Sequence, residues 1–425
     1  MRRMSERRRW RARHEAAGLV SLLILMVVSA LPASAAEVDT LLGPSPGSYA
    51  LLSPDGVARI PFKLFRGDIL MAARVNGKDV RMMLDNGFLW DQLLFFGSPL
   101  VDSLGLKYDG EIEMGGGGEG NTVKSKTASG ITIRFPGVEF YDQTAVITPY
   151  GSGLTTMWWG TEGQVSAAFL KHFVVEINYD RMEIVLTPPD RYAYAGRGVE
   201  VPMRQLLPGA WGIPAVMELM DGRRFPLDAG MDLGQGDALQ VACGGAHSIG
   251  LPENAVAASL GFGVQGETRG YIGRIRAIEI GGYRIDSLIA GFVPADFKGN
   301  VFHEVTIGMD LFSRFNIVYD YPHHRMYIEP AASFHDGYEY DMSGLSMRKG
   351  AGEYLEIVSV APDSPGGRAG LRVGDRVVRI NGASAAGYDR YELEPLLTRE
   401  GTIVTLTVLR GKGEEEISIK LRRII

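Results

Sequence analysis

FLKHFVVEINYDRMEIVLTP (residues 169–188) is followed 142 positions later by LFSRFNIVYDYPHHRMYIEP (residues 311–330). A phenylalanine, a tyrosine and a proline stand at matching places in the two stretches. A match of this length at a fixed spacing indicates an internal repeat, and the rest of the chain can be searched for its other members.

Three further landmarks recur upstream in the same order, at spacings of 143, 145 and 146 residues. They are RMMLDNG (81–87) with RFPLDAG (224–230), SLGL (103–106) with SIGL (248–251), and the glycine runs 115–120 with 261–266. Repeats of solenoids and propellers are only ~20–50 residues long, so a unit of about 140 residues indicates a duplicated lobe.

Short apolar runs between glycines and prolines are typical of β-strands. We predict strands at residues 131–135, 174–177, 182–186, 277–280 and 316–319. The predicted fold class is therefore mainly β, with two homologous all-β lobes, each with room for one short helix.

The composition excludes several classes of protein. A formal net charge of −6 gives no support to a nucleic-acid partner. Cys243 is the only cysteine, so neither an intrachain disulfide nor a cysteine-based zinc site can form. The seven histidines are scattered and include no H-E-x-x-H motif. We therefore expect neither a metal nor another cofactor.

The N-terminus has the pattern of a secretory signal. Basic residues precede an apolar run at 16–31, and Ala33-Ser34-Ala35 follows it. We predict a signal peptide at 1–35, a linker at 36–54, and export to the periplasm or cell surface. The alternative is an uncleaved segment that anchors the protein in the membrane, because the apolar run is almost long enough to span it.

Each predicted lobe carries an aspartate in an apolar-aspartate-x-glycine pattern, at Asp85 and Asp228. The glycines Gly87 and Gly230 give the backbone the freedom for a tight turn that presents the carboxylate. A single motif of this kind is a weak signal. Two at equivalent places in a duplicated lobe can meet at the lobe interface, where two close carboxylates share one proton. The charged member then accepts a proton from water while the neutral member donates one to a carbonyl.

With these residues the chain resembles the retropepsin-like aspartic proteases, the clan of pepsin and retropepsin, in their two-lobe single-chain form. The resemblance implies lobe 1 at 55–190, lobe 2 at 191–335 and an active-site cleft between them. It implies that Asp85 and Asp228 are the catalytic pair of an endopeptidase that acts on peptides or unfolded polypeptides. It also implies flaps that close over the substrate, with Gly117, Gly118, Gly120, Gly263 and Gly266 as flap residues.

The chain departs from this family at the residue after each aspartate. The family normally has threonine or serine there, and the hydroxyl ties the two lobes together beneath the catalytic pair. Here these residues are Asn86 and Ala229, and an alanine side chain forms no hydrogen bond. The alternative function is therefore a catalytically impaired protein that binds peptides without cutting them.

After a predicted linker at 331–340, residues 341–425 resemble a PDZ domain, a small β-barrel with helices. The motifs are AGLRVGD (369–375) and ING (380–382), followed by a terminal hairpin. The resemblance implies that a loop holds the C-terminal carboxylate of a peptide ligand through backbone N–H groups. The loop residues are Gly344, Leu345, Ser346 and Met347. The alternative is a module that packs on the lobes and binds nothing.

Overall fold

The computed structural model describes residues 47–425, except residues 66, 89, 151–159, 166–169, 254, 351, 362, 389 and 412. The predicted signal peptide and residues 36–46 of the predicted linker lie outside the described residues. Within the described residues, no helix is long and apolar enough to cross a membrane.

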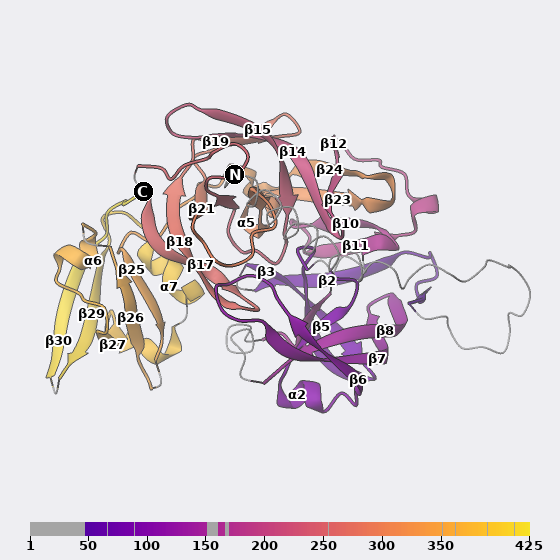
Figure 1. Cartoon of the computed structure of the whole chain (residues 1–425), viewed down its shortest axis with the longest axis horizontal. Coiled ribbons are helices and arrows are strands. Elements are labelled where there is room, and N and C mark those ends of the chain that lie inside the picture. Colours follow the sequence, from indigo (N-terminus) through magenta and orange to yellow (C-terminus); the bar gives the residue numbers. More distant parts are fainter. Residues whose placement is uncertain are drawn as a thin grey trace, which may run out of the picture. The chain divides into compact units, whose positions relative to one another are not determined.

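Lobe 1 follows the alternation of its sequence. Along its second strand Ala58, Ile60 and Phe62 are buried while the residues between them are exposed, because side chains of a strand point alternately to opposite faces. Its elements are β1 (Tyr49–Leu51), β2 (Ala58–Phe65), β3 (Asp68–Val75), β4 (Lys78–Leu84), β5 (Leu93–Phe96), α2 (Pro99–Asp102), β6 (Lys107–Met114), β7 (Val123–Phe135), β8 (Val138–Thr148), β9 (Gly163–Val165), β10 (Val174–Asn178) and β11 (Glu183–Thr187) (Figure 1).

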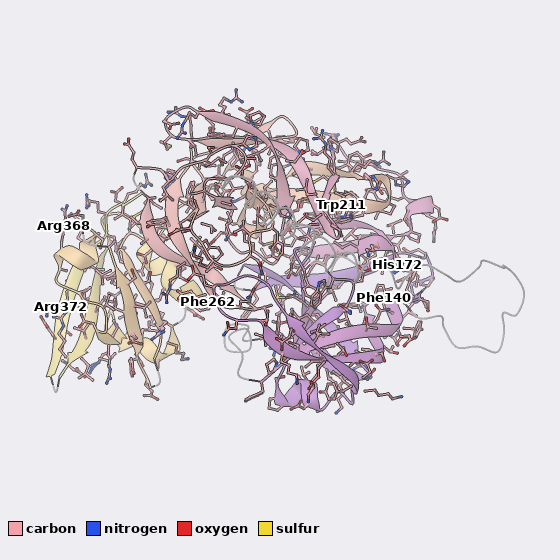
Figure 2. All side chains as sticks on the ribbon, viewed as in Figure 1. Phe140, His172, Trp211, Phe262, Arg368 and Arg372 are labelled. Atoms are coloured by element: carbon pink, nitrogen blue, oxygen red, sulfur yellow. The ribbon has the colours of Figure 1, made fainter. Side chains whose placement is uncertain are left out.

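Strand β1 lies where the sequence predicted only a linker. It pairs antiparallel with β8, and the ring of Tyr49 lies 4.6 Å from the ring of Phe173 and 5.3 Å from that of His172. His172 and Phe140 are labelled in Figure 2. The linker is therefore shorter than predicted, since this aromatic contact attaches residues 49–51 to lobe 1.

Lobe 2 repeats the order of lobe 1. Its elements are η1 (Pro189–Arg191), β12 (Val199–Pro202), β13 (Arg204–Leu207), β14 (Ala210–Glu218), β15 (Arg224–Met231), β16 (Leu239–Ala242), β17 (Val256–Gly263), β18 (Gly266–Arg274), β19 (Ala277–Ile280), β20 (Tyr283–Asp286), β21 (Ile289–Val293), β22 (Val305–Ile307), α5 (Met309–Phe312), β23 (Phe315–Asp320), η2 (Tyr321–His323) and β24 (Arg325–Pro330).

The two lobes share one sheet along their boundary. Strands β10 and β23 pair antiparallel, with Glu176 opposite Val318, and the sheet continues through β11 and β2 on one side and through β24 and β12 on the other. Glu176 and Val318 are themselves 142 residues apart, which is the repeat spacing. The axis that relates the two lobes therefore passes through this pair.

The structure confirms the duplication and the mainly β fold. All five predicted strands are present, in β7, β10, β11, β19 and β23, and only residue 182 of the predicted ranges lies outside its strand. Phe173 and Phe315 are equivalent and both are buried, at 0% and 2% exposed. In each lobe, one strand runs parallel to a short strand that follows the flap region. These pairs are β4 with β9 and β15 with β22.

The predicted linker at 331–340 is partly packed. It contains η3 (Ala332–His335), where Phe334 lies 5.2 Å from the ring of Phe315 and 5.8 Å from that of Tyr283. The following segment has its own apolar core and a separate six-stranded sheet. Its elements are β25 (Leu345–Lys349), β26 (Leu355–Val360), α6 (Pro365–Arg368), β27 (Arg376–Ile380), β28 (Ala383–Ser384), η4 (Ala385–Gly387), α7 (Arg390–Leu397), β29 (Ile403–Arg410) and β30 (Gly413–Lys420).

Candidate active site

Asp85 stands at the end of β4, where the strand turns. Its N–H donates to the carbonyl of Val165 in β9 over 3.0 Å, which fixes the start of the turn. The carboxyl oxygen Oδ1 accepts hydrogen bonds from the N–H groups of Gly87, at 2.8 Å, and Phe88, at 3.2 Å. Oδ2 accepts from Gln164 Nε2 at 2.7 Å. The carboxyl group is thus held on both oxygens by lobe 1.

Asp232 occupies the corresponding place in lobe 2. It follows β15, and its N–H donates to the carbonyl of Ile307 in β22 over 3.0 Å. Its Oδ1 accepts a hydrogen bond of 2.9 Å from the N–H of Gly234. The same strand, turn and parallel partner therefore present one carboxyl group in each lobe.

These two carboxyl groups meet across the lobe boundary and are hydrogen-bonded to each other. Each also lies against the turn glycine of the opposite lobe. A Cβ atom on Gly87 would lie 2.2 Å from Cγ of Asp232, and one on Gly234 would lie 2.5 Å from Cγ of Asp85. Only glycine fits at these two positions, because any side chain would collide with the opposite carboxyl group.

Asp228, the aspartate chosen from the sequence, is not the partner of Asp85. It lies within β15 opposite Pro214, and both of its carboxyl oxygens accept from Arg204 Nη1 at 2.9 Å. Four residues along a strand separate Asp228 from Asp232 by about 13 Å. The second member of the pair is therefore corrected to Asp232.

The prediction that Ala229 and Gly230 form the turn beside the second aspartate is also wrong. Ala229 is fully buried opposite Ile213 within the sheet, and Gly230 faces the ring of His303. Their places are taken by Leu233 and Gly234. The sequence did contain a signal for this pairing. DLG at 232–234 lies 147 residues after the Asp85 motif, and the two landmarks that follow are repeated at 145 and 146 residues. The spacing of 147 is closer to these values than the spacing of 143 for Asp228 is.

Burial and mutual proximity set the protonation of the pair. Burial raises the pKa of Asp85 well above its usual value, and the charge of Asp232 raises it further. Burial also raises the pKa of Asp232, but the hydrogen bonds from the Gly234 N–H and from Asp85 oppose that shift. Asp85 is therefore the member that holds the shared proton, and Asp232 is the member that carries the charge.

A third carboxyl group, which the sequence analysis did not identify, lies near the pair. Asp68 begins β3 and is only 8% exposed. Burial, and next the charge of Asp232, raise its pKa to about 8. Asp68 is therefore neutral at neutral pH and adds no second negative charge beside Asp232.

Asn86 connects the two lobes directly beneath the pair. It is 5% exposed; its Oδ1 accepts a hydrogen bond of 2.7 Å from the N–H of Leu233, and its Nδ2 donates to the hydroxyl of Tyr321 over 3.1 Å. The reverse connection is missing, because Leu233 is apolar. The predicted asymmetry between the lobes is present, with Leu233 rather than Ala229 as the residue that lacks a polar group.

The glycine runs form the tips of two hairpins, β6–β7 and β17–β18, and the tips contact each other. Gln265 donates from its N–H to the carbonyl of Gly117 over 2.8 Å and accepts at its carbonyl from the N–H of Gly120 over 2.6 Å. Its side chain accepts from the N–H of Gly116 and donates to the carbonyl of Gly120. Gln265, which the sequence analysis missed, therefore connects the tips.

The glycines explain how closely the hairpin tips approach. A Cβ atom on Gly118 would lie 2.5 Å from the backbone of Gln265, and one on Gly263 would lie 2.4 Å from the carbonyl of Gly117. Gly266 has φ +95° and closes the second tip. Val264 also packs against the cluster that contains Met83 and Phe88, which flank Asp85 in the sequence. The tips therefore lie next to the aspartate pair.

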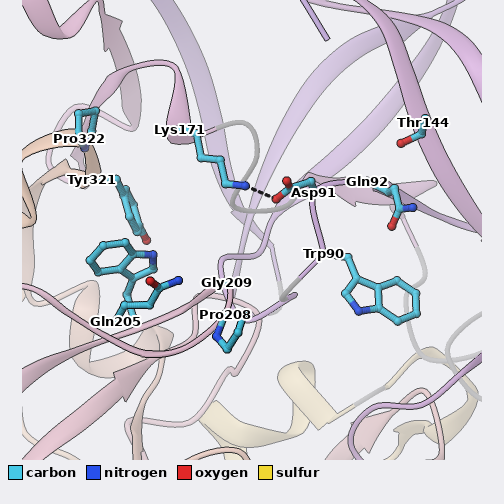
Figure 3. Close-up of a pocket in the computed structure, with 11 residues that line it drawn as sticks. Trp90, Asp91, Gln92, Thr144, Lys171, Gln205, Pro208, Gly209, Tyr321 and Pro322 are labelled. Atoms are coloured by element: carbon cyan, nitrogen blue, oxygen red, sulfur yellow. Dashed lines mark hydrogen bonds and ion pairs between the residues drawn. The ribbon is translucent and has the colours of Figure 1, made fainter. Parts of the chain in front are cut away.

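A pocket of about 800 Å³ has walls from both lobes, and neither aspartate of the pair lines it (Figure 3). Trp90 and Gln92 come from the segment after the Asp85 turn, and Pro208 and Trp211 come from the β13–β14 hairpin. Tyr321, the partner of Asn86, also lines it. Within the part of the chain that the structure describes, no group of three or more His, Cys, Asp or Glu side chains could hold a metal ion.

The predicted carboxylate-binding loop of the C-terminal domain already contacts a carboxylate. Asp341 Oδ1 accepts from the N–H groups of Ser343, at 2.7 Å, and Gly344, at 2.9 Å. Leu345 is buried, and its N–H donates to Ser343 Oγ over 3.1 Å. Ser346 and Met347 continue into β25, which pairs with β26 on one side. The N–H groups of Ser343, Gly344 and Leu345 are therefore occupied by the chain itself.

Comparison with known proteins finds a family match for the C-terminal segment. Residues 356–423 match the family model described as PDZ domain. Similar proteins include a "Probable CtpA-like serine protease" of Staphylococcus aureus, 34% identical over 99 residues, which are 23% of this chain and 20% of that protein. One of Staphylococcus epidermidis is 33% identical over 98 residues, 22% of this chain and 20% of that protein. The chain thus matches about a fifth of the length of these curated relatives.

Among solved structures, the chain is similar to the crystal structure of aspartic proteinase from Irpex lacteus. The two share 11% sequence identity over 66% of this chain and 99% of that chain, with a TM-score of 0.43.

Proposed function

We propose that this protein is an exported aspartic-type endopeptidase, in which Asp85 and Asp232 activate a water molecule and the PDZ domain docks peptides. The observation that carries the proposal is the hydrogen bond between the two buried carboxyl groups across the lobe boundary. Two buried carboxyl groups with one shared proton supply an acid and a base at the same point.

The protonation of the pair assigns a chemical role to each aspartate. The carboxylate of Asp232 takes a proton from water as the water oxygen attacks the carbonyl carbon of a peptide bond, and Asp85 gives its proton to the carbonyl oxygen. The resulting intermediate collapses when the C–N bond breaks, the leaving nitrogen takes the proton from Asp232 and a hydroxyl proton returns to Asp85. The pair is then restored to its starting state.

The hairpin tips supply the second requirement, which is exclusion of water. They lie next to the pair, and their connection through Gln265 is made of four hydrogen bonds to backbone groups of the opposite tip. A peptide enters when these bonds open. Closing the tips over it strengthens the electrostatic interactions inside the site.

The test compares three aspartates on the full chain. Asp85→Asn and Asp232→Asn should each lower cleavage of a short-peptide library at least about 100-fold, since each removes a proton-transfer group. Asp228→Asn is the matched control, because Asp228 lies in β15 four residues before Asp232 and the change only removes its pairing with Arg204. Cleavage that survives in both dyad variants, or that is lost in Asp228→Asn alone, would contradict the assignment.

A second candidate is a peptide-binding protein that does not cut. It is favoured by Leu233, which leaves the connection beneath the pair one-sided. In that case the wild-type protein cleaves nothing at any pH between about 3 and 8. It would still bind library peptides with the same affinity as Asp85→Asn.

Two parts of the proposal remain, which are export and peptide docking. Export rests on the pattern at 1–35, and N-terminal sequencing of the mature protein should begin at Ala36. An uncleaved N-terminus in the membrane fraction would favour the anchored form. Peptide docking rests on the PDZ match and on β25, which is the end strand of the six-stranded sheet among the described residues, so that an extended peptide can pair with it as an additional strand.

A further inference from the structure

Gln164 is a polar side chain in an otherwise apolar row. It lies in β9, opposite Met83 of β4 on one side and opposite Leu94 of β5 on the other. All three residues are buried, with Gln164 only 6% exposed. Burial of an amide lowers the stability of a fold unless the amide is hydrogen-bonded. The partner is Asp85, whose Oδ2 accepts from Gln164 Nε2 over 2.7 Å, so a buried donor is directed at the aspartate pair.

The two oxygens of the Asp85 carboxyl group are held by different parts of lobe 1. Oδ1 accepts from the N–H groups of Gly87 and Phe88 in the turn that follows Asp85 itself. Oδ2 accepts from Gln164 on a separate strand. Hydrogen bonds at one oxygen still allow the carboxyl group to rotate, and a donor at the second oxygen removes that freedom. Gln164 therefore fixes the plane of the carboxyl group that meets Asp232.

Among the described residues, lobe 2 has no equivalent donor. Thr306 is the counterpart of Gln164, because each lies in a short parallel strand, opposite the residue two positions before the aspartate of its lobe. A threonine hydroxyl is two bonds closer to the backbone than a glutamine amide. The hydrogen bonds found for Asp232 come from backbone N–H groups of its turn and from Asp85. The side-chain donor thus acts on the aspartate that holds the shared proton.

The chemistry of proton transfer gives this bond a role. A donor at a carboxyl oxygen favours the charged form of the group. In the proposed reaction Asp85 starts neutral, gives its proton to the carbonyl oxygen of the peptide and becomes a carboxylate. The bond from Gln164 strengthens during this step, because hydrogen bonds to ionised acceptors are roughly twice as strong as those between neutral groups. An interaction that strengthens as charge develops lowers the barrier of the step.

We propose that Gln164 is a positioning residue of the aspartate pair, which fixes the Asp85 carboxyl group and makes it a stronger acid by stabilising the charge that proton transfer leaves behind. This inference rests on the proposed function. Burial raises the pKa of Asp85 and the charge of Asp232 raises it further, and the donor on Gln164 opposes both effects. Because Gln164 is buried, it acts through Asp85 and not on the substrate.

Other charged groups near the pair enter the design of the test. Asp232 faces Asp85 from the turn after β15 and titrates together with it. Asp68, at the start of β3, has a pKa raised to about 8 by burial and by the charge of Asp232. Glu162, directly before β9, is paired with Arg81. Since Asp68 titrates in the same range as the upper step of the pair, each measurement is repeated with Asp68→Asn.

The experiment is an NMR titration of the full chain, isotope-labelled at the aspartate carboxyl carbons, with signals assigned by their loss in Asp85→Asn and Asp232→Asn. Gln164→Met keeps the side-chain length but removes the donor, and should move the upper titration midpoint of the pair to higher pH by about one pH unit. Gln164→Glu replaces the donor by a carboxyl group and should move it at least as far. Gln143→Met is the matched control, because the Gln143 amide donates to the carbonyl of Tyr141 in β8, and both midpoints should stay unchanged.

Kinetics on peptides test whether the same bond serves the reaction. Gln164→Met should lower kcat roughly tenfold with little change in KM, since it weakens the acid and leaves the substrate contacts intact. The alkaline limb of its pH profile should move upward together with the titration midpoint. A residue that only fills space would leave the profile in place, because methionine has nearly the same volume as glutamine.

The titration separates failure of this inference from failure of the proposed function. A wild-type protein that cuts nothing, but whose upper midpoint rises in Gln164→Met, contradicts the peptidase and supports the positioning of Asp85 by Gln164. An upper midpoint that is equal in the wild type and in both Gln164 variants overturns the inference, even if the wild-type protein cleaves peptides. A raised midpoint with unchanged kcat in a protein that cleaves also overturns it, because the acidity of Asp85 then does not serve the reaction.

Discussion

The side-chain oxygen Oδ1 of Asn86 accepts a hydrogen bond of 2.7 Å from the N–H of Leu233, across the boundary between the lobes. The two residues directly follow the paired aspartates Asp85 and Asp232 in sequence. This bond places one lobe against the other at the point where the carboxyl groups meet.

Asn86→Ala should therefore loosen the junction of the lobes. The change leaves the buried N–H of Leu233 without a partner, which typically costs about 1–3 kcal/mol of the free energy of unfolding. Tyr321→Phe leaves only the Asn86 Nδ2 donor unpaired, whereas Asn86→Ala leaves both the Leu233 N–H and the Tyr321 hydroxyl unpaired, so the cost of Tyr321→Phe should be the smaller of the two. Denaturant unfolding of the two variants measures both losses in the free energy of unfolding. Equal stabilities of the two variants would contradict the connection of the lobes through Asn86.

Gly234→Ala should abolish the proposed peptidase activity, because its new Cβ atom would lie 2.5 Å from Cγ of Asp85 and separate the carboxyl groups. Gly236→Ala is the control two residues away, since its Cβ atom meets nothing within 4 Å. Activity of Gly236→Ala should equal that of the wild type. A fully active Gly234→Ala protein would show that the pair need not be in contact.

Asp68→Asn should stabilise the protein at neutral pH. The pKa of Asp68 is about 8 in the folded chain and near 3.8 when unfolded, so its contribution to stability is complete below about pH 4 and is lost as pH rises toward 8. An asparagine does not ionise, so the gain at pH 7–8 should be on the order of 1–3 kcal/mol and should vanish near pH 4. Thermal unfolding across this range tests it, with exposed Asp79→Asn as the control.

Asp341→Ala should change what the PDZ domain binds. Wild-type protein should not distinguish peptides with a free C-terminus from the same peptides with an amide, because Asp341 occupies the N–H groups of Ser343 and Gly344. The variant frees these groups and should gain a preference of roughly tenfold for the free carboxylate. Asp363→Ala removes an exposed carboxylate nearby and should gain none.

Hydrogen exchange gives a readout of the same loop without a ligand. The N–H groups of Ser343 and Gly344 should be protected from exchange in the wild type and unprotected in Asp341→Ala. Rapid exchange of both in the wild-type protein would contradict the hydrogen bonds to Asp341.

The sequence by itself determined the architecture. The spacing of 142 residues between two matching stretches predicted two homologous lobes, and the alternation of apolar residues predicted their strands, which depends only on the two-residue period of side chains along a strand. The PDZ motifs and Asp85 were found in the same way. Each of these signals is local, or is a repetition of a local pattern, and so it can be read along the chain.

The tertiary structure alone decided which residues meet. Asp228-Ala229-Gly230 and Asp232-Leu233-Gly234 have the same local pattern, four residues apart. The contact with Asp85 is chosen by where β15 ends beside Ile307 of β22, a pairing that joins segments distant in sequence. The burial of Asp68, the contact of the hairpin tips through Gln265 and the Asp341 carboxylate within its loop arise similarly. Each depends on packing between groups whose separation in space no local pattern encodes.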